Sequence, residues 1–382
     1  MKKNLLSIRL KFVENNIDVN AKIVFHEPLN EVNLILNNSL NINKIENNVC
    51  SIQWEKTGEF IPEFRVNSQK IKVISEHPIT ELTITYYGTV SSWYNVLTDE
   101  IKALSFYSVW FPQELPFGID QDEVIIEKGE EFFIVKGEFY SDKNTWHYGG
   151  KGFDPFNIIA YKKSVLKTVS NDFLNIYYVD HSIKKHAQKT GEVYKDIIDF
   201  YNNKLFYEKE LPVLDIPCIF PALKTGGGYQ RNGLMFATDL GNDDLYLQWF
   251  LAHETAHNWC QGANAYSWED WLNETTAEWA FLLYALHKDK NELFQWSIEP
   301  KIKNVDKYPS IKTADGSRPQ GVHEKGTVLF YKIYKKFNQD VIEKMVRGFT
   351  NLEIKDTENF IKMVGKEIGQ EVAQEIIKGI QS

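Results

Sequence analysis

The spacing of apolar residues changes near residue 170. Before that point apolar and polar residues alternate, as in SIRLKFV, where Ile8, Leu10 and Phe12 share one face, and again in ELTITYYG. A period of two is typical of strands with one buried face. EVIIEKGEEFFIVKGEF is predicted to form two strands joined by a turn at Lys128 and Gly129. The first part of the chain is therefore predicted to be β-rich.

After residue 170 the apolar residues recur at the helical spacing of three to four. Helices are predicted for SIKKHAQKTGEVYKDIIDFYNNKL, for DDLYLQWFLAHETAHNWCQG, which Gly262 closes, and from about Asp270 to His287. Two stretches nearer the C-terminus carry apolar stripes, on Leu329, Ile333 and Phe337 and on Phe360, Val364, Ile368, Val372, Ile376 and Ile380. The pattern predicts an α+β protein with a β-rich domain over residues 1–170 and a mainly helical domain over residues 171–382.

Composition and charge narrow the possible partners. The 382 residues are 43% hydrophobic and 25% charged, which is typical of a globular chain. A net charge of −9 argues against a nucleic-acid partner and favours a peptide, protein or small molecule. No apolar run reaches the roughly 20 residues of a membrane span, and the N-terminus lacks the apolar core of a signal peptide. We therefore expect a cytoplasmic location without membrane contact. The sequence does not indicate whether the protein is a monomer or an oligomer.

The motif HETAH carries the clearest chemistry. His253 and His257 are four residues apart in a predicted helix, so both imidazoles face one side and can bind one Zn²⁺. Glu254 is rotated by about 100° around the helix axis from His253, and from this position it can reach a water bound to the metal.

A catalytic zinc site usually has three protein ligands and one open position. Glu274 and Glu278 both follow on the next predicted helix, in WLNETTAEW. Because they are four residues apart and face the same way, spacing alone leaves either as the third ligand.

The run HETAHNW followed by WLNE resembles the gluzincin metallopeptidases of the aminopeptidase N and leukotriene hydrolase family. The resemblance implies that Glu274, and not Glu278, is the third zinc ligand, although the spacer after His257 is two residues shorter than is usual in that family. It also implies a β-sandwich-like domain over residues 1–170 and a thermolysin-like zinc peptidase domain over residues 171–382. The large C-terminal helical domain of longer family members is expected to be absent.

Two positions depart from the family's pattern. In GGYQRNGLMF, Gln230 stands where the family has a glutamate that binds the substrate's free α-ammonium. Gly227 and Gly228 are predicted to form a glycine-rich turn before an edge strand whose backbone can pair with a peptide. Because the Gln230 amide offers only a neutral acceptor and Arg231 adds a positive charge, recognition of a free N-terminus is expected to be weakened.

The second departure is His323, in HEKG, where the family has a tyrosine that donates a hydrogen bond to the oxyanion. A histidine N–H can replace that donor; the alternative is a surface histidine in a degenerated site. We expect a zinc-dependent peptidase with Glu254 as general base, either a poor aminopeptidase or an endopeptidase. The other hypotheses are a weak or inactive zinc- and peptide-binding module, and a chain that binds no metal.

Overall fold

The computed structural model describes residues 4–47, 52–61, 66–90, 95–114, 119–127, 129–148, 157–179, 184–207, 211, 213–218, 228–231, 233–238 and 243–381. Gly227 and Lys128 lie outside these residues, so their predicted positions in turns stay predictions.

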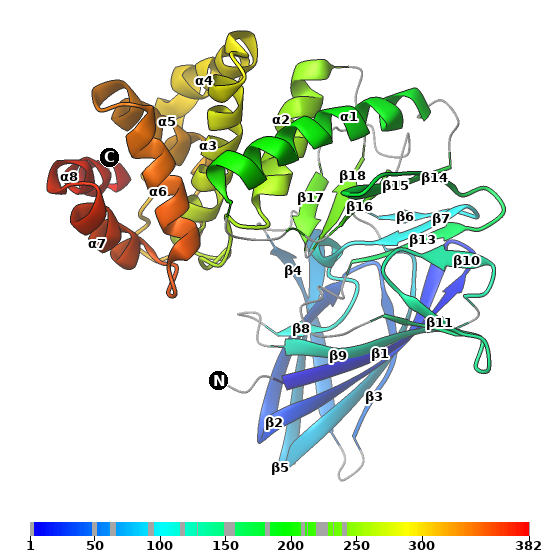
Figure 1. Ribbon diagram of the computed structural model, residues 1–382. Coiled ribbons are helices and arrows are strands. Elements are labelled where there is room, and N and C mark those ends of the chain that lie inside the picture. Colours follow the sequence, from blue (N-terminus) through cyan, green and yellow to red (C-terminus); the bar gives the residue numbers. More distant parts are fainter. Residues whose placement is uncertain are drawn as a thin grey trace.

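Strands make up most of the first half of the chain. Their bounds are β1 (Asn4–Val13), β2 (Asn16–Asn37), β3 (Asn41–Glu46), β4 (Gln53–Ile61), β5 (Val66–Gly88), β6 (Val96–Leu97), β7 (Ile101–Leu104), β8 (Gln113–Glu114), β9 (Ile119–Glu127), β10 (Phe132–Ile134), β11 (Glu138–Tyr140), β12 (Thr145–Tyr148), β13 (Ile158–Lys162), β14 (Lys167–Ser170), β15 (Leu174–Tyr178), β16 (Leu214–Pro217), β17 (Gly228–Arg231) and β18 (Leu234–Ala237). In the described residues they form three sheets (Figure 1). A nine-stranded sheet runs β11-β12-β9-β1-β2-β5-β3, with β4 paired to β5 and β8 to β2; a four-stranded sheet runs β10-β13-β7-β6; a five-stranded sheet runs β14-β15-β16-β18-β17.

The nine-stranded sheet follows the alternating pattern in the sequence. Leu6, Ile8 and Leu10 of β1 are buried, and in the antiparallel pairing with β2 Ile8 lies opposite Ala21 and Leu10 opposite Val19. Side chains of successive residues point to opposite faces of a sheet, so this register gathers the apolar ones on one side. They form the core of the N-terminal part.

Helices dominate the second half. Their bounds are α1 (Lys184–Phe200), α2 (Asp244–Ala256), α3 (Trp271–His287), α4 (Asn291–Asn304), α5 (Val322–Lys336), α6 (Gln339–Asn351), α7 (Thr357–Glu367) and α8 (Gln370–Ile380), with shorter turns η1 (Phe106–Ser108), η3 (Tyr201–Leu205), η4 (Trp268–Asp270) and η5 (Val305–Lys307). Helices α1 and α2 lie over the five-stranded sheet, and α3 to α8 gather beside them (Figure 1). No helix in the described part of the chain is long and apolar enough to cross a membrane.

The predicted α+β fold class is confirmed, with a β-rich N-terminal part and a helical C-terminal part. The boundary between residues 170 and 171 stays a prediction; β14 already belongs to the five-stranded sheet. The strands predicted on either side of Lys128 are present, but β9 pairs with β1 and β12 while β10 pairs with β13, so the two belong to different sheets.

One predicted helix end was wrong. Helix α2 ends at Ala256 rather than near Gly262, because the N–H groups of Asn258 and Trp259 bond to carbonyls three residues back and tighten the chain into turns. The C-terminal apolar stripe is divided between α7 and α8 by Gly369, whose φ of 152° departs from helical geometry.

Gly326 allows α5 to approach α3 closely. A Cβ at this position would lie 1.8 Å from Thr275 Oγ1, so a larger residue would push the two helices apart. Thr275 follows Glu274 directly and Gly326 is three residues after His323. The glycine therefore sets the distance between the two helices that carry these predicted site residues.

We predict that Gly326→Ala lowers the free energy of unfolding by roughly 1–3 kcal/mol, the usual cost of overpacking a dense core. Gly365→Ala on α7 is the matched control, because its new Cβ would meet only the flexible tip of Gln370, 3.0 Å away. Urea denaturation of both variants measures the difference. Equal stabilities would contradict a tight contact at Gly326.

Candidate active site and metal centre

Helix α2 presents the HETAH residues to a cleft. Its first turn is capped by Asp243, whose carboxylate accepts the N–H groups of Leu245 and Tyr246. His253 lies in the last turn and His257 is the C-cap residue, with φ −61° and ψ −11°. Because this is still right-handed helical geometry, the two imidazole rings stay on one side, with centroids 5.0 Å apart.

The loop between α2 and α3 is fixed by Asn273, the asparagine of WLNE. Its side-chain oxygen accepts from Ala263 N at 3.1 Å, and its Nδ2 donates to Ala263 O at 3.0 Å and to Asp270 Oδ1 at 2.8 Å. This clamp holds the loop against the first turn of α3, where Glu274 lies. The shorter spacer therefore still brings Glu274 to the HETAH face.

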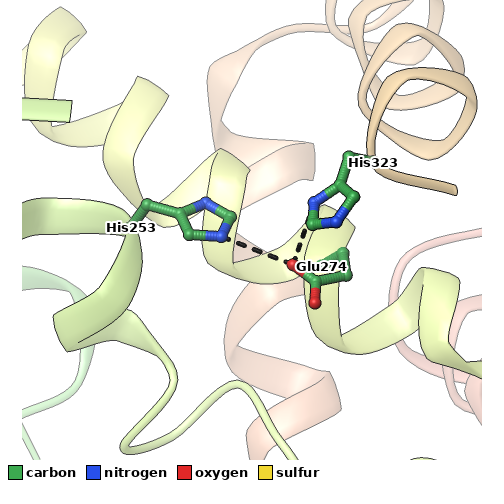
Figure 2. A group of neighbouring side chains, drawn as sticks. All are labelled: His253, Glu274 and His323. Carbon is green, nitrogen blue, oxygen red and sulfur yellow. Dashed lines mark ion pairs between the residues drawn. The ribbon is translucent and has the colours of Figure 1, made fainter. Parts of the chain in front are cut away.

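Three imidazoles converge on one oxygen of Glu274. Glu274 Oε2 lies 3.4 Å from His253 Nε2, 3.6 Å from His257 Nε2 and 3.0 Å from His323 Nδ1. Figure 2 shows His253 and His323 on opposite sides of the carboxylate. The ligand atoms of His253, Glu274 and His323 all lie within 4.8 Å of one another. His257 is not in this group, although it approaches the same carboxylate oxygen.

These residues fit a zinc ion chemically. Glu274 Oε2 is buried and has no hydrogen-bond partner of normal geometry in the described residues, although three ring nitrogens face it. A buried carboxylate oxygen without such a partner needs another cationic or donor group beside it. Imidazole nitrogen and carboxylate oxygen are ordinary zinc ligands, so a divalent ion satisfies this arrangement.

Glu278 contacts the other side of the His253 ring from Glu274. It is 2% exposed, and its Oε2 lies 2.9 Å from His253 Nδ1 and accepts from Trp249 Nε1 at 2.9 Å. Its Oε1 accepts from Ser297 Oγ at 2.7 Å and Lys301 Nζ at 2.8 Å. Burial alone would raise the pKa of Glu278, but Lys301 and His253 hold it well below its usual range. Glu278 thus supports the outer side of the His253 ring.

Glu254 faces the same cleft as the converging imidazoles. The cleft has a volume of about 290 Å³, and its lining includes Glu254, His253, His257, Glu274 and His323. Burial raises the pKa of Glu254, while the neighbouring His253 and His257 lower it. A carboxylate so placed can exchange a proton with a group in the cleft.

The lining of the cleft also includes Gln230 and Arg231. Gln230 is 5% exposed, and its Nε2 donates to Asn258 Oδ1 at 3.0 Å. The guanidinium of Arg231 donates from Nη2 to Tyr107 OH at 2.6 Å and lies over the Tyr107 ring, 5.6 Å from its centroid. The cleft lining therefore includes a neutral amide and a cation, and the cation contacts a phenol.

Gly228 occupies a position that admits no side chain. A Cβ there would lie 2.0 Å from the backbone oxygen of Phe236, on the paired strand β18. Strand β17, which begins at Gly228, is the last strand of its sheet in the described residues. Gly228 therefore fits the predicted glycine-rich edge of the cleft.

Three residues of this region were not predicted from the sequence. Tyr107 comes from η1, far from the rest in sequence, and no local pattern indicates that it reaches Arg231. Arg318 lines the cleft and has no motif around it. Glu278 was weighed only as a ligand, although its spacing of four from Glu274 places it one turn further along the same face.

Comparison with known proteins agrees with this architecture. No protein-family model and no curated protein matches the sequence. An M1 zinc metallopeptidase from Deinococcus radiodurans, in a mutant bound to a Tyr-Ser-Ala substrate, superposes with a TM-score of 0.64 and 14% identity, over 99% of this chain and 93% of that one. A two-domain M1 zinc metallopeptidase mutant bound to L-tryptophan gives 0.64 and 14% over 100% and 95%. The chain has the M1 zinc metallopeptidase fold.

We predict that Glu278→Gln weakens zinc binding about 10–100-fold, as loss of a carboxylate behind a metal-bound imidazole usually does. The amide keeps the size of the side chain but removes the charge beside His253 and leaves Lys301 without its carboxylate. Glu299→Gln, at an exposed position of α4, is the control. Competition with a chromophoric chelator measures the affinities; equal affinities would contradict a supporting role for Glu278.

Proposed function

We propose that this chain is a zinc-dependent peptidase. The observation that carries the proposal is that Glu254 lies in one cleft with the convergent His253, His257 and Glu274. A metal site beside a free carboxylate is the arrangement that hydrolytic metalloenzymes need. The M1 metallopeptidase fold supports the same conclusion.

In this proposal His253, His257 and Glu274 would hold one Zn²⁺. When bound, zinc lowers the pKa of a water towards about 7 and polarises a carbonyl group. Glu254 takes the proton from the attacking water and delivers it to the leaving amine nitrogen. Its half-buried position strengthens this role, because burial keeps its pKa above the ordinary value.

His323 serves as the donor to the developing oxyanion. Its side chain is 45% exposed, so a substrate carbonyl can approach it, while Nδ1 faces the carboxylate of Glu274. An N–H donor about 3 Å from the oxyanion stabilises charge that forms only during the reaction.

The wall with Gln230 and Arg231 determines the substrate class in this proposal. The Gln230 amide has no charge to offer an ammonium, and the Arg231 guanidinium repels one. Binding instead relies on the edge of β17, whose backbone groups can pair with an extended peptide. The enzyme therefore accepts peptides without a free N-terminus and acts as an endopeptidase or an exopeptidase of relaxed specificity.

We predict that Glu254→Gln keeps stoichiometric zinc and lowers kcat by about 10²–10⁴, the usual contribution of a general base. Mass-spectrometric mapping of cuts in a peptide pool, with a chelator control, measures activity and metal dependence together. Glu367→Gln, exposed at the end of α7, should match the wild type.

The same assay applied to one peptide in free and N-acetylated form tests the substrate class. We expect cleavage of both forms. Cuts confined to the first residue of the free form would contradict relaxed specificity. Zinc without hydrolysis in wild type and variant alike would identify a binding module, and absence of stoichiometric zinc would contradict the metal site.

A further inference from the structure

A second cavity is lined by residues of α2, α4 and α5. Its volume is about 430 Å³, within the roughly 300–1,000 Å³ that is usual for ligand sites. Its lining includes four aromatic side chains, a lysine and a glutamate, which are Tyr246, Trp249, Trp296, Tyr308, Lys301 and Glu324. All six residues are half-buried, so each packs against its neighbours and still reaches the cavity. No step of the proposed hydrolysis uses this cavity.

Three of the aromatic rings pack against one another. The ring centroid of Trp249 lies 5.4 Å from that of Tyr246 and 6.4 Å from that of Trp296. Tyr308 packs on Gly321, where a Cβ would lie 2.2 Å from the tyrosine ring. The face of an aromatic ring carries partial negative charge and attracts a cation, most strongly in tryptophan. The aromatic lining therefore favours a cationic ligand.

The charged residues of the lining favour the same kind of ligand. Lys301 Nζ lies 2.8 Å from Glu278 Oε1 and 3.2 Å from Ser297 Oγ, so a buried carboxylate balances the charge of this lysine. Within the described residues, the side chain of Glu324 makes no hydrogen bond or ion pair. A carboxylate forms strong, charge-assisted hydrogen bonds with an ammonium or guanidinium group. Aromatic faces and one carboxylate together suit such a group.

The cavity adjoins the candidate metal centre. The ring centroid of Trp249 lies 5.6 Å from that of His253, and Trp249 Nε1 donates to the Glu278 oxygen that contacts His253 Nδ1. On α5, Glu324 directly follows His323, which lines the cleft. A peptide that lies across the cleft can therefore place one of its side chains in the cavity.

We propose that this cavity binds a basic side chain, lysine or arginine, of the peptide substrate. The aromatic faces and Glu324 hold the charged end, and the methylene groups of the same side chain pack against the rings. The proposal rests on the proposed function and adds a substrate class to it. The preferred peptides carry a basic residue at one fixed position relative to the bond that is cut.

Cut mapping on the peptide pool tests this preference. We expect lysine and arginine to be enriched at one position relative to the cut. A peptide with lysine at that position is then compared with its acetyl-lysine form, which lacks the charge. The ratio of their kcat/KM values should favour lysine about tenfold, as one well-formed cation–π contact does.

Variants of the glutamate test the source of this ratio. Glu324→Gln should lower it, and Glu324→Lys should change the preference towards a peptide with glutamate at the same position. Glu292→Gln, at an exposed position of α4, removes an equal charge outside the cavity and should leave the ratio unchanged. Because both peptides meet the same metal centre, the ratio does not depend on the rate of the chemical step.

Binding without hydrolysis separates this proposal from the proposed function. Fluorescence anisotropy on zinc-loaded Glu254→Gln compares a labelled, end-blocked alanine peptide that has one central lysine with its acetyl-lysine form. Tighter binding of the lysine form by a protein that cuts no peptide would contradict the peptidase function and not the basic-side-chain site. Three results would overturn the site: cleavage without a preference for basic residues, a ratio that Glu324→Gln leaves unchanged, or a preference for aromatic residues that Trp296→Leu abolishes.

Discussion

The position of one carboxylate oxygen, Glu274 Oε2, determines the geometry of the whole candidate site. Helices α2, α3 and α5 each contribute part of the contact around it, and the nitrogens of three imidazoles come within 3.0–3.6 Å. Such convergence requires the helices to approach closely. The Asn273 clamp fixes one end of α3 to the preceding loop, and the missing side chain of Gly326 lets α5 approach α3. The local packing thus brings three imidazole rings close to the Glu274 carboxylate.

Much of this arrangement could be predicted from the sequence, because it is encoded at short range. The alternation before residue 170 predicts the strands, and the spacing of His253 and His257 places both rings on one helical face. The α+β fold class follows from the same periods. The end of α2 could not be placed, because hydrogen bonds three residues apart, rather than Gly262, terminate the helix.

Contacts between distant segments could not be predicted. The bond from Arg231 to Tyr107 joins residues 124 positions apart, and that from Arg318 to Asp270 joins residues 48 apart. No periodicity and no motif in the sequence indicates either contact, because only the tertiary fold brings the partners together. The contact between Glu278 and His253 could not be predicted either. The spacing of a carboxylate along a helix is the same whether it binds a metal or contacts a histidine.

In each of the three histidines, the ring nitrogen that faces away from Glu274 contacts a different kind of group. A carboxylate lies behind the ring of His253, a backbone carbonyl lies behind that of His257, and a guanidinium lies behind that of His323. The lining of the same cleft includes the neutral amide of Gln230 and the cation of Arg231. In the proposed function these two residues select the substrate, whereas Glu254 and the residues around Glu274 carry out hydrolysis, so the two tasks belong to different side chains of one cleft.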